Sequence, residues 1–258
     1  MPRPKRRGRK ALIVLLVLLL VIVGLLVVAD RVGASVANDK VAQQVAVQAR
    51  KNDVKLGQEP TAEITGFPFL TQVAAGKYDK ILVHMRDLQA QAYSVPKLDI
   101  TATGVHAKAS DVLNGSGTIT ADQVDGRATI GWGYLQQTAK DQLKQKIQVD
   151  DLTLSGTGGN LTVHLTVPVL SQQVKVVGTA KVTAADDHRS VVVSVKDLKP
   201  DGTKLPSYAQ QALTSLAQQL TVNVTLPKLP YGLKLYDIQP ASDGLQVEAR
   251  ASDVTLAG

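Results

Sequence analysis

The four histidines, His84, His106, His164 and His188, are the side chains best suited to acid–base or metal chemistry in this 258-residue chain. No two of them have the i, i+4 spacing with which a helix presents two histidines to one metal ion. Three lie in segments that the hydrophobic pattern predicts to be strands, and the fourth lies in a predicted turn. Because a histidine on the solvent-facing side of a strand needs no ligand, we expect neither a metal site nor histidine-based catalysis.

The other groups that could support catalysis also lack the necessary spacing. Ser116 stands in Asn-Gly-Ser-Gly, which is not the GxSxG pattern of a nucleophile on a strand-to-helix turn. The glycines within residues 156–159 form a predicted hairpin loop, and no helix follows them to bind a phosphate. Asp150 and Asp151 are neighbours in the chain, and neighbours in a strand point to opposite faces. We therefore predict a protein that is not an enzyme and has no cofactor; a hydrolase whose residues converge only in the fold is the alternative.

The N-terminal segment has the pattern of a membrane anchor. Residues 1–10 carry six Lys or Arg and no acid, and residues 11–29 are 19 consecutive apolar or glycine residues. A helix of this length measures about 28 Å, close to the hydrocarbon thickness of a bilayer. The positive-inside rule places residues 1–10 in the cytoplasm, 11–29 across the cell membrane as a single-pass signal anchor, and 30–258 in an extracytoplasmic domain.

A cleavable signal peptide is the competing interpretation, because Ser35-Val36-Ala37 has the small residues of a cleavage site. The apolar run is longer than the 7–15 residues usual in signal peptides, which favours a retained anchor. Either interpretation predicts that the remainder of the chain is exported. The chain has no cysteine, so the exported domain must fold without a disulfide.

The net charge of +7 does not indicate nucleic acid binding. Without residues 1–10 the chain has 23 Lys or Arg (29 less 6) against 22 Asp or Glu, a net charge of +1. The excess positive charge belongs to the segment that sets the membrane topology.

The remainder predicts an α+β fold dominated by antiparallel strands. Residues 32–49 have apolar residues at helical spacing and predict an amphipathic helix, as do 133–147 and 206–220. Strict alternation, clearest at 160–169, predicts strands with one covered and one solvated face. The predicted strands are 80–88, 96–105, 117–124, 149–155, 160–169, 174–182, 190–195, 221–226 and 244–251. Their aliphatic, aromatic-poor faces could form a solid core, or curl around a helix and leave a channel for acyl chains.

Both phenylalanines of the chain lie in one short segment, Gly66-Phe-Pro-Phe-Leu-Thr-Gln72. The proline between them lacks a backbone donor, which excludes the middle of a helix or of a central strand. We expect a turn that is either a lip contacting acyl chains as they enter or a purely structural corner.

This segment, with Ala75-Gly-Lys-Tyr78, resembles the hallmark segment of the LmeA-like phospholipid-binding family of actinobacterial envelope proteins. Residues 229–235 and 243–247 are similar to its closing segment, whereas residues 110–190 show no motif that matches. The resemblance implies binding of anionic phospholipid outside the cytoplasmic membrane, in support of cell-envelope assembly. It also implies a TULIP-like fold, in which a long curled antiparallel sheet wraps around the amphipathic helix. The runner-up is a structural or scaffolding domain that binds cell-wall polymer or an envelope protein.

On this interpretation, the residues expected to contact lipid are apolar residues of the turn and of two strands. They are Phe67, Phe69, Leu70, Tyr78, Ile81, Val83, Leu161, Val163, Leu165 and Val167. Lys77 and Lys80 follow the turn and are candidate headgroup contacts, although solvated charges at a strand edge have the same pattern.

Overall fold

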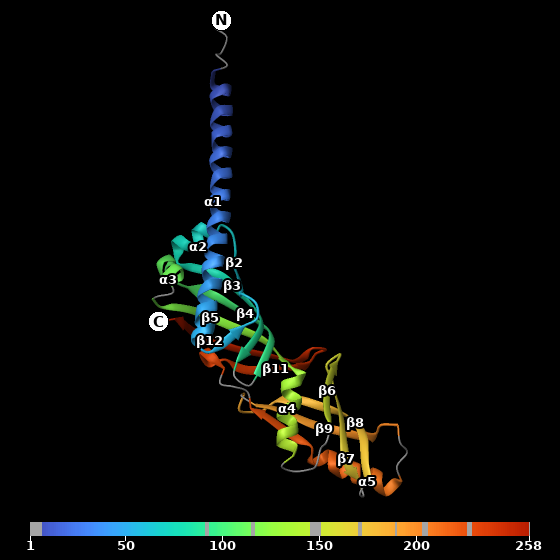
Figure 1. Ribbon diagram of the computed structural model, residues 1–258. Coiled ribbons are helices and arrows are strands. Elements are labelled where there is room, and N and C mark those ends of the chain that lie inside the picture. Colours follow the sequence, from blue (N-terminus) through green and yellow to red (C-terminus); the bar gives the residue numbers. More distant parts are fainter. Residues whose placement is uncertain are drawn as a thin grey trace.

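In the computed structural model the longest element is one continuous helix, α1 (Arg7–Lys51), shown in Figure 1. The structure describes residues 7–90, 93–114, 117–144, 151–169, 172–188, 190–202, 206–225 and 229–257. The apolar run and the amphipathic segment, which the sequence predicted as separate segments, are therefore halves of the same helix. Its first half, from Leu12, is the one described helix long and apolar enough to cross a membrane, and it is not buried by the rest of the chain.

The second half of α1 packs on a seven-stranded antiparallel sheet, the first sheet. Its strands follow the order β1 (Val54–Leu56), β3 (Lys77–Ala90), β4 (Tyr93–His106), β5 (Ile119–Gly131), β12 (Gly244–Ala257) and β11 (Lys234–Pro240), with β2 (Thr61–Thr65) also paired to β3. Alternate residues form apolar rows across the strands, for example Ile81, Ala102 and Val124. The small side chains Ala34 and Ala37 let α1 approach this face closely, and Val41 and Val45 extend the contact.

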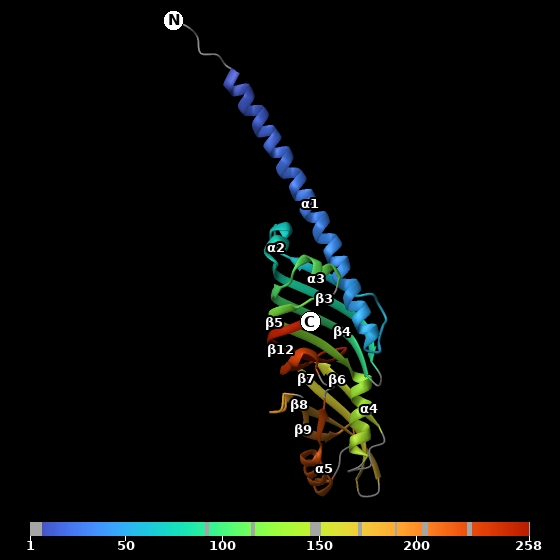
Figure 2. The same ribbon diagram turned by 90° about the vertical axis from the view of Figure 1, so that its left-hand side faces the viewer.

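A second, five-stranded antiparallel sheet is inserted between β5 and β11 of the first. Its order is β10 (Thr221–Thr225), β9 (Ser190–Pro200), β8 (Gln172–Ala184), β7 (Asn160–Val169) and β6 (Leu152–Thr157). Two helices accompany it, α4 (Trp132–Leu143) and α5 (Ser207–Gln219). Figures 1 and 2 show this sheet at the end of the domain opposite the apolar half of α1. The insertion holds most of the 110–190 segment in which the sequence showed no motif.

The α+β class and the curled antiparallel sheet are confirmed, but the strands form two open sheets instead of one. Helices α2 (Phe69–Ala75) and α3 (Ala109–Asn114), the short 3₁₀ helix η1 (Pro230–Gly232) and strands β1, β2 and β11 were not predicted. The helices and β1 are too short to show a period. Strand β2 has a single large apolar residue, Ile64, and in β11 a register shift between Leu235 and Asp237 breaks the alternation. The predicted ends at 145–150 and at 226 lie outside the described residues.

Candidate functional site

An apolar cavity lies between the second sheet and α4. Its wall is lined by Trp132, Leu135, Ala139, Leu143, Leu152, Leu154, Leu161, Val163, Leu165, Val182, Val191, Val193, Val195, Leu220 and Leu245. Every one of these side chains is apolar or, for Trp132, largely so. The wall therefore offers contact area to a ligand and almost no hydrogen bond, which is the chemistry that a hydrocarbon chain requires.

The cavity is narrow. The empty space between its walls is about 640 Å³, but part of this space is open solvent. The volume comparable with that of other cavities is only about 40 Å³. Ligand pockets for small molecules usually measure about 300–1,000 Å³. A whole acyl chain can enter only if part of the wall moves outward.

Helix α4 is the part of this wall that we expect to move; its side-chain hydrogen bonds to the sheet include a long one, from the Gln136 amide to the carbonyl oxygen of Leu154 at 3.4 Å. Leu135, Ala139 and Leu143 form one buried stripe that faces the cavity. The polar ties of α4 to the sheet include the Gln142 side-chain amide, which donates to the carbonyl oxygen of Asn223 at 3.0 Å on the exposed side. At the start of the helix, the indole N–H of Trp132 donates to the carbonyl oxygen of Ala241 at 3.2 Å.

A more open groove shares one wall residue, Val182, with the cavity. Lys181 of β8 and Lys196 of β9 line this groove, together with Asn160 and Thr179. Ammonium groups suit an anionic headgroup, but strand alternation turns Lys181 to the face of β8 opposite to the one on which Val182 lines the cavity.

The residues predicted to contact lipid divide between the two sheets. Leu161, Val163 and Leu165 line the cavity, and Val167 belongs to the same apolar cluster. Ile81 and Val83 pack with α1 on the first sheet. The structure thus brings three of the predicted residues to the cavity wall and a fourth, Val167, into the same apolar cluster, and it places the others at the first sheet, near α1 and α2.

Gly66 and Gln72 have a clear structural role in the Gly66–Gln72 segment. Gly66 has a φ of 104°, and a Cβ there would lie 2.6 Å from Nε2 of Gln72, so glycine is required. Gln72 is buried; its amide donates to the carbonyl oxygen of Thr65 and accepts the backbone N–H of Asp79. The segment therefore closes the turn between β2 and β3.

The aromatic residues of this region differ in burial. Phe69 and Tyr78 are buried in the cluster beneath α1, with ring centroids 6.4 Å apart, and burial raises the pKa of the Tyr78 hydroxyl. Phe67 and Leu70 are exposed. Lys77 and Lys80 are also exposed, at the start of β3. Their role in headgroup binding stays a prediction.

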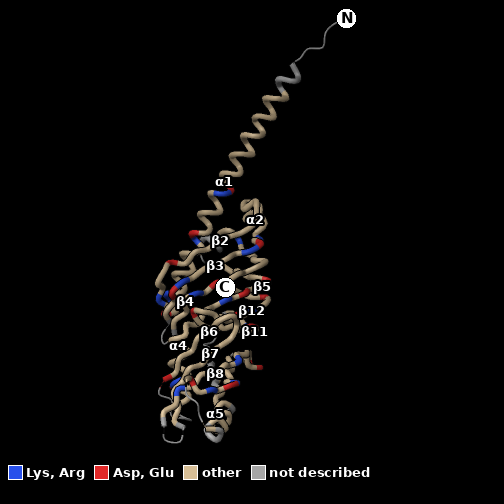
Figure 3. Tube along the Cα trace, turned by 90° about the vertical axis from the view of Figure 1, so that its right-hand side faces the viewer, with Lys and Arg blue, Asp and Glu red and all other residues tan. Residues whose placement is uncertain are grey.

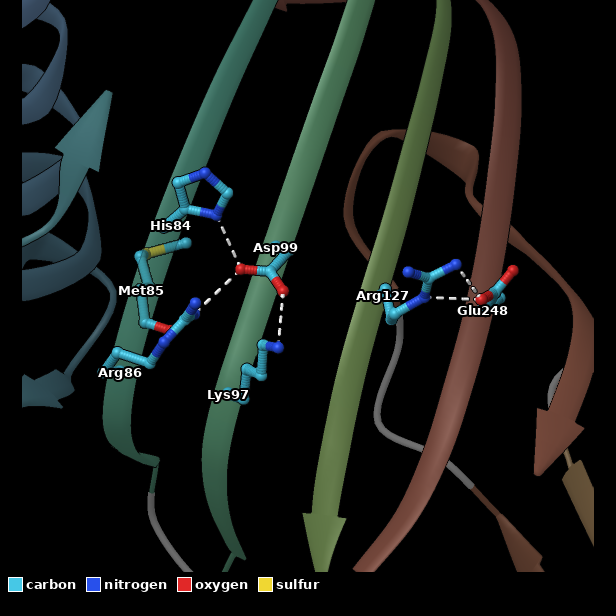
Figure 4. Close-up of polar contacts among 7 residues, drawn as sticks. All are labelled: His84, Met85, Arg86, Lys97, Asp99, Arg127 and Glu248. Atoms are coloured by element: carbon cyan, nitrogen blue, oxygen red, sulfur yellow. Dashed lines mark hydrogen bonds and ion pairs between the residues drawn. The ribbon is translucent and has the colours of Figure 1, made fainter. Parts of the chain in front are cut away.

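A row of charged side chains crosses the other face of the first sheet (Figure 4). Asp99 accepts hydrogen bonds from His84 Nδ1 at 2.7 Å and Arg86 Nη1 at 2.8 Å, and Lys97 Nζ lies 3.5 Å away. Arg127 pairs with Glu248 further along the row. Burial opposes ionisation of Asp99, but these hydrogen bonds and positive charges together lower its pKa.

This charged row has the character of a structural feature. Strand alternation places His84 and Asp99 on the face opposite to Val83 and Ile100, so the row does not face the apolar clusters. Within the row drawn in Figure 4, each carboxylate is paired with a cation. We infer that the row stabilises cross-strand pairing, as opposite charges in register do.

Sequence reasoning missed the α4 side of the cavity. The stripe Leu135, Ala139 and Leu143 was recognised as one face of a helix, but nothing in its spacing distinguishes a face against a cavity from a face against a filled core. Val191, Val193 and Val195 of β9 were missed for the same reason, although their alternation was read correctly as a strand.

A family model described as LmeA-like phospholipid-binding matches residues 28–250. The match extends from the end of the apolar run through both sheets, and it includes the 110–190 segment. Comparison with curated proteins and with solved structures finds no match.

Proposed function

This chain belongs to the LmeA-like phospholipid-binding family, and from this premise we propose that it holds the acyl chains of a phospholipid in the cavity of the second sheet. The observation that carries the proposal is the wholly apolar lining of that cavity. A phospholipid tail needs apolar area and has no donors or acceptors to satisfy, so aliphatic walls suit it well. The protein would hold or transfer lipid for cell-envelope assembly, without catalysis.

The headgroup would lie in the groove that borders the cavity. Lys181 and Lys196 line the groove, and Val182 belongs to both the groove and the cavity. A phosphate placed there would meet two ammonium groups, which favours an anionic lipid. The predicted contacts Lys77 and Lys80 belong to the first sheet and would serve a lipid at a different stage of uptake.

The proposal includes a retained anchor: residues 1–10 in the cytoplasm, 11–29 across the membrane, and the domain from residue 30 outside it. The continuity of α1 supports this arrangement. The candidate cleavage site Ser35-Val36-Ala37 lies inside the helix, and Ala37 is buried against the first sheet. Cleavage there would also remove Asp30, whose carboxylate accepts the backbone N–H of Leu70 at 2.8 Å.

A cross-link that holds α4 against the sheet tests the proposal. Because the chain has no cysteine, Gln142→Cys with Asn223→Cys introduces a single pair that a short bis-maleimide can join. We expect native mass spectrometry of the full chain to show bound phospholipid in the parent and in the uncross-linked variant. The cross-linked form should take up no added lipid, since the cavity cannot widen.

The matched control places the cysteines on the first sheet, at the cross-strand positions Arg127 and Glu248, where the same cross-linker should leave lipid uptake unchanged. Absence of phospholipid from the parent, after incubation with vesicles of anionic phospholipid, would contradict the proposed function itself. Equal uptake by the cross-linked and uncross-linked forms would place the lipid outside this cavity.

A further inference from the structure

Two large apolar side chains are exposed at the end of the domain from which the apolar half of α1 emerges. The exposed fractions of Phe67 and Leu70 are 56% and 41%, respectively. They stand at the start of α2, whose sequence FLTQVAA has no charge. In Figures 1 and 2, α2 forms the end of the domain nearest to the apolar half of α1.

Other residues of the same segment have clear roles in folding, whereas the exposed parts of Phe67 and Leu70 have none. Gly66 permits the turn, Phe69 fills the core, and Gln72 bonds to the backbone of both neighbouring strands. Phe67 and Leu70 each bury only part of their surface against the protein. Because they are adjacent at one end of the domain, their exposed parts form a candidate contact surface.

Two contacts fix these side chains at a defined position along α1. The backbone N–H of Leu70 donates to Oδ1 of Asp30 at 2.8 Å, and Asp30 is buried. The guanidinium carbon of Arg31 lies 5.0 Å from the centre of the Phe67 ring, a cation–π geometry. Asp30 and Arg31 are the first charged residues after the apolar run of 11–29. Figure 3 shows a long uncharged stretch of α1 that ends at charged positions before the helix reaches the sheet.

We infer that Phe67, Leu70 and Arg31 form a docking surface for the outer face of the membrane that α1 crosses. The inference rests on the retained anchor of the proposed function. If residues 11–29 fill the hydrocarbon layer, residues 30 and 31 lie at headgroup depth, and the two contacts hold Phe67 and Leu70 at the same depth. Apolar side chains of interfacial helices enter about 5–10 Å into this boundary, while Arg extends its charge toward the phosphates.

The choice of a lipid surface as partner follows from this position. A second protein could cover an apolar patch anywhere on the domain, but this patch adjoins the end of a membrane-length apolar segment. The surface would orient the domain on the bilayer, with the cavity directed away from it, and would mark where a lipid leaves the leaflet.

The chain lacks cysteine, so single-cysteine variants of the full chain can be labelled with a polarity-sensitive fluorophore. In vesicles of phosphatidylglycerol and phosphatidylcholine that contain spin-labelled lipid, Leu20→Cys reports the anchor and Leu70→Cys the docking surface. Ser215→Cys, at an exposed position of α5, reports the end of the domain farthest from the apolar half of α1 (Figure 1). We expect lipid quenching at positions 20 and 70, and quenching by a water-soluble agent at position 215.

A second reporter keeps both apolar side chains in place. Ala74 is exposed and lies one turn after Leu70, so Ala74→Cys should also be shielded from the water-soluble quencher. Adding Phe67→Ser with Leu70→Ser should remove that shielding. Adding Val47→Ser should not, because this exposed residue lies about 27 Å beyond Ala29 along α1.

The outcomes separate the inference from its premise. Lipid quenching at position 20 together with full water accessibility at positions 70 and 74 overturns the docking surface and leaves the anchor intact. Water accessibility at position 20 overturns the anchor and the docking surface together. Neither result bears on whether the cavity binds lipid, which the cross-linking experiment measures.

Discussion

The two sheets have the same alternating strand pattern, yet one is filled and the other is hollow. Beneath α1, the first sheet packs Phe69 and Tyr78 into a cluster with alanine and valine side chains of the helix. In the second sheet, the aliphatic face meets helices of 12 and 13 residues and leaves a cavity. The covering element, and not the strand pattern, decides whether an aliphatic face becomes a core or a binding site.

The hydrogen bonds that attach the covering helix to its sheet also differ between the two regions. Helix α1 is joined to the first region by short hydrogen bonds: the backbone N–H groups of Ile64 and Leu70 donate to Asn38 and Asp30, both at 2.8 Å. Helix α4 is joined to the second sheet by longer ones, from the Gln136 amide to the carbonyl oxygen of Leu154 at 3.4 Å and from the exposed Gln142 amide to that of Asn223 at 3.0 Å. A long or exposed hydrogen bond costs less to break than a short, part-buried one. We therefore expect the second region to open more readily than the first.

The largest effect that we expect is from Phe69→Ala. Truncating a buried phenylalanine should lower the free energy of unfolding by about 3–5 kcal/mol. Phe67→Ala is the matched control: its side chain is exposed, and the change should stay within about 0.5 kcal/mol. Urea denaturation of both variants measures the difference. Comparable losses for the two would show that the filled core beneath α1 is wrongly assigned.

The next effect in size comes from adding the same large side chain to each region. Ala102→Phe overpacks the filled cluster of the first sheet and should cost about 1–3 kcal/mol. Ala139→Phe projects from α4 into the narrow cavity and fills it, and because α4 can shift outward to admit the ring, stability should change by less than about 1 kcal/mol. The same substitution should abolish phospholipid retention in native mass spectrometry. A folded Ala139→Phe variant that retains lipid would break the contrast between the two regions.

The sequence predicted the elements of both regions well, because long strands with strict alternation leave little ambiguity. Residues 160–169 were assigned with their observed bounds, and Leu161, Val163 and Leu165 were placed on one apolar face, as found. The sequence did not predict that the strands divide into two sheets. That division depends on β5 pairing with β12 across an insertion of about a hundred residues, and long-range pairing leaves no local pattern.

The candidate site was predicted only in part, for a physical reason. An apolar residue beside a cavity and one in a filled core have the same type and the same spacing, so Leu165 and Val83 could not be told apart. The turn at Gly66–Gln72 also shows that residue type and spacing do not determine burial. Phe67 and Phe69 are two residues apart and chemically identical, but one is exposed and the other is buried.

The smallest expected effect concerns the polar faces of the two sheets. Asp99 of the first sheet has a side chain that is 23% exposed and has two cationic neighbours, Arg86 and Lys97, whereas Asp201 beside the second sheet is 55% exposed and lies 3.9 Å from His164. Exposed pairs contribute about 0–1 kcal/mol because solvent screens them. Asp99→Asn should therefore cost up to about 1 kcal/mol at neutral pH, and Asp201→Asn almost nothing.

The pH dependence of Asp99→Asn identifies the cause. Burial alone would raise the pKa of Asp99, but the hydrogen bonds from His84 and Arg86 and the charges of Arg86 and Lys97 lower it in the folded state. A lowered pKa stabilises the fold fully above the unfolded value of about 3.9, and this contribution is lost as the pH falls through the folded pKa. The stability difference between parent and Asp99→Asn should thus be constant from pH 7 to about 5 and shrink below about pH 4. Urea denaturation at pH 7, 5, 4 and 3 measures it. A difference that stays constant down to pH 3 would mean that asparagine disturbs packing and that the charged row does not stabilise the first sheet.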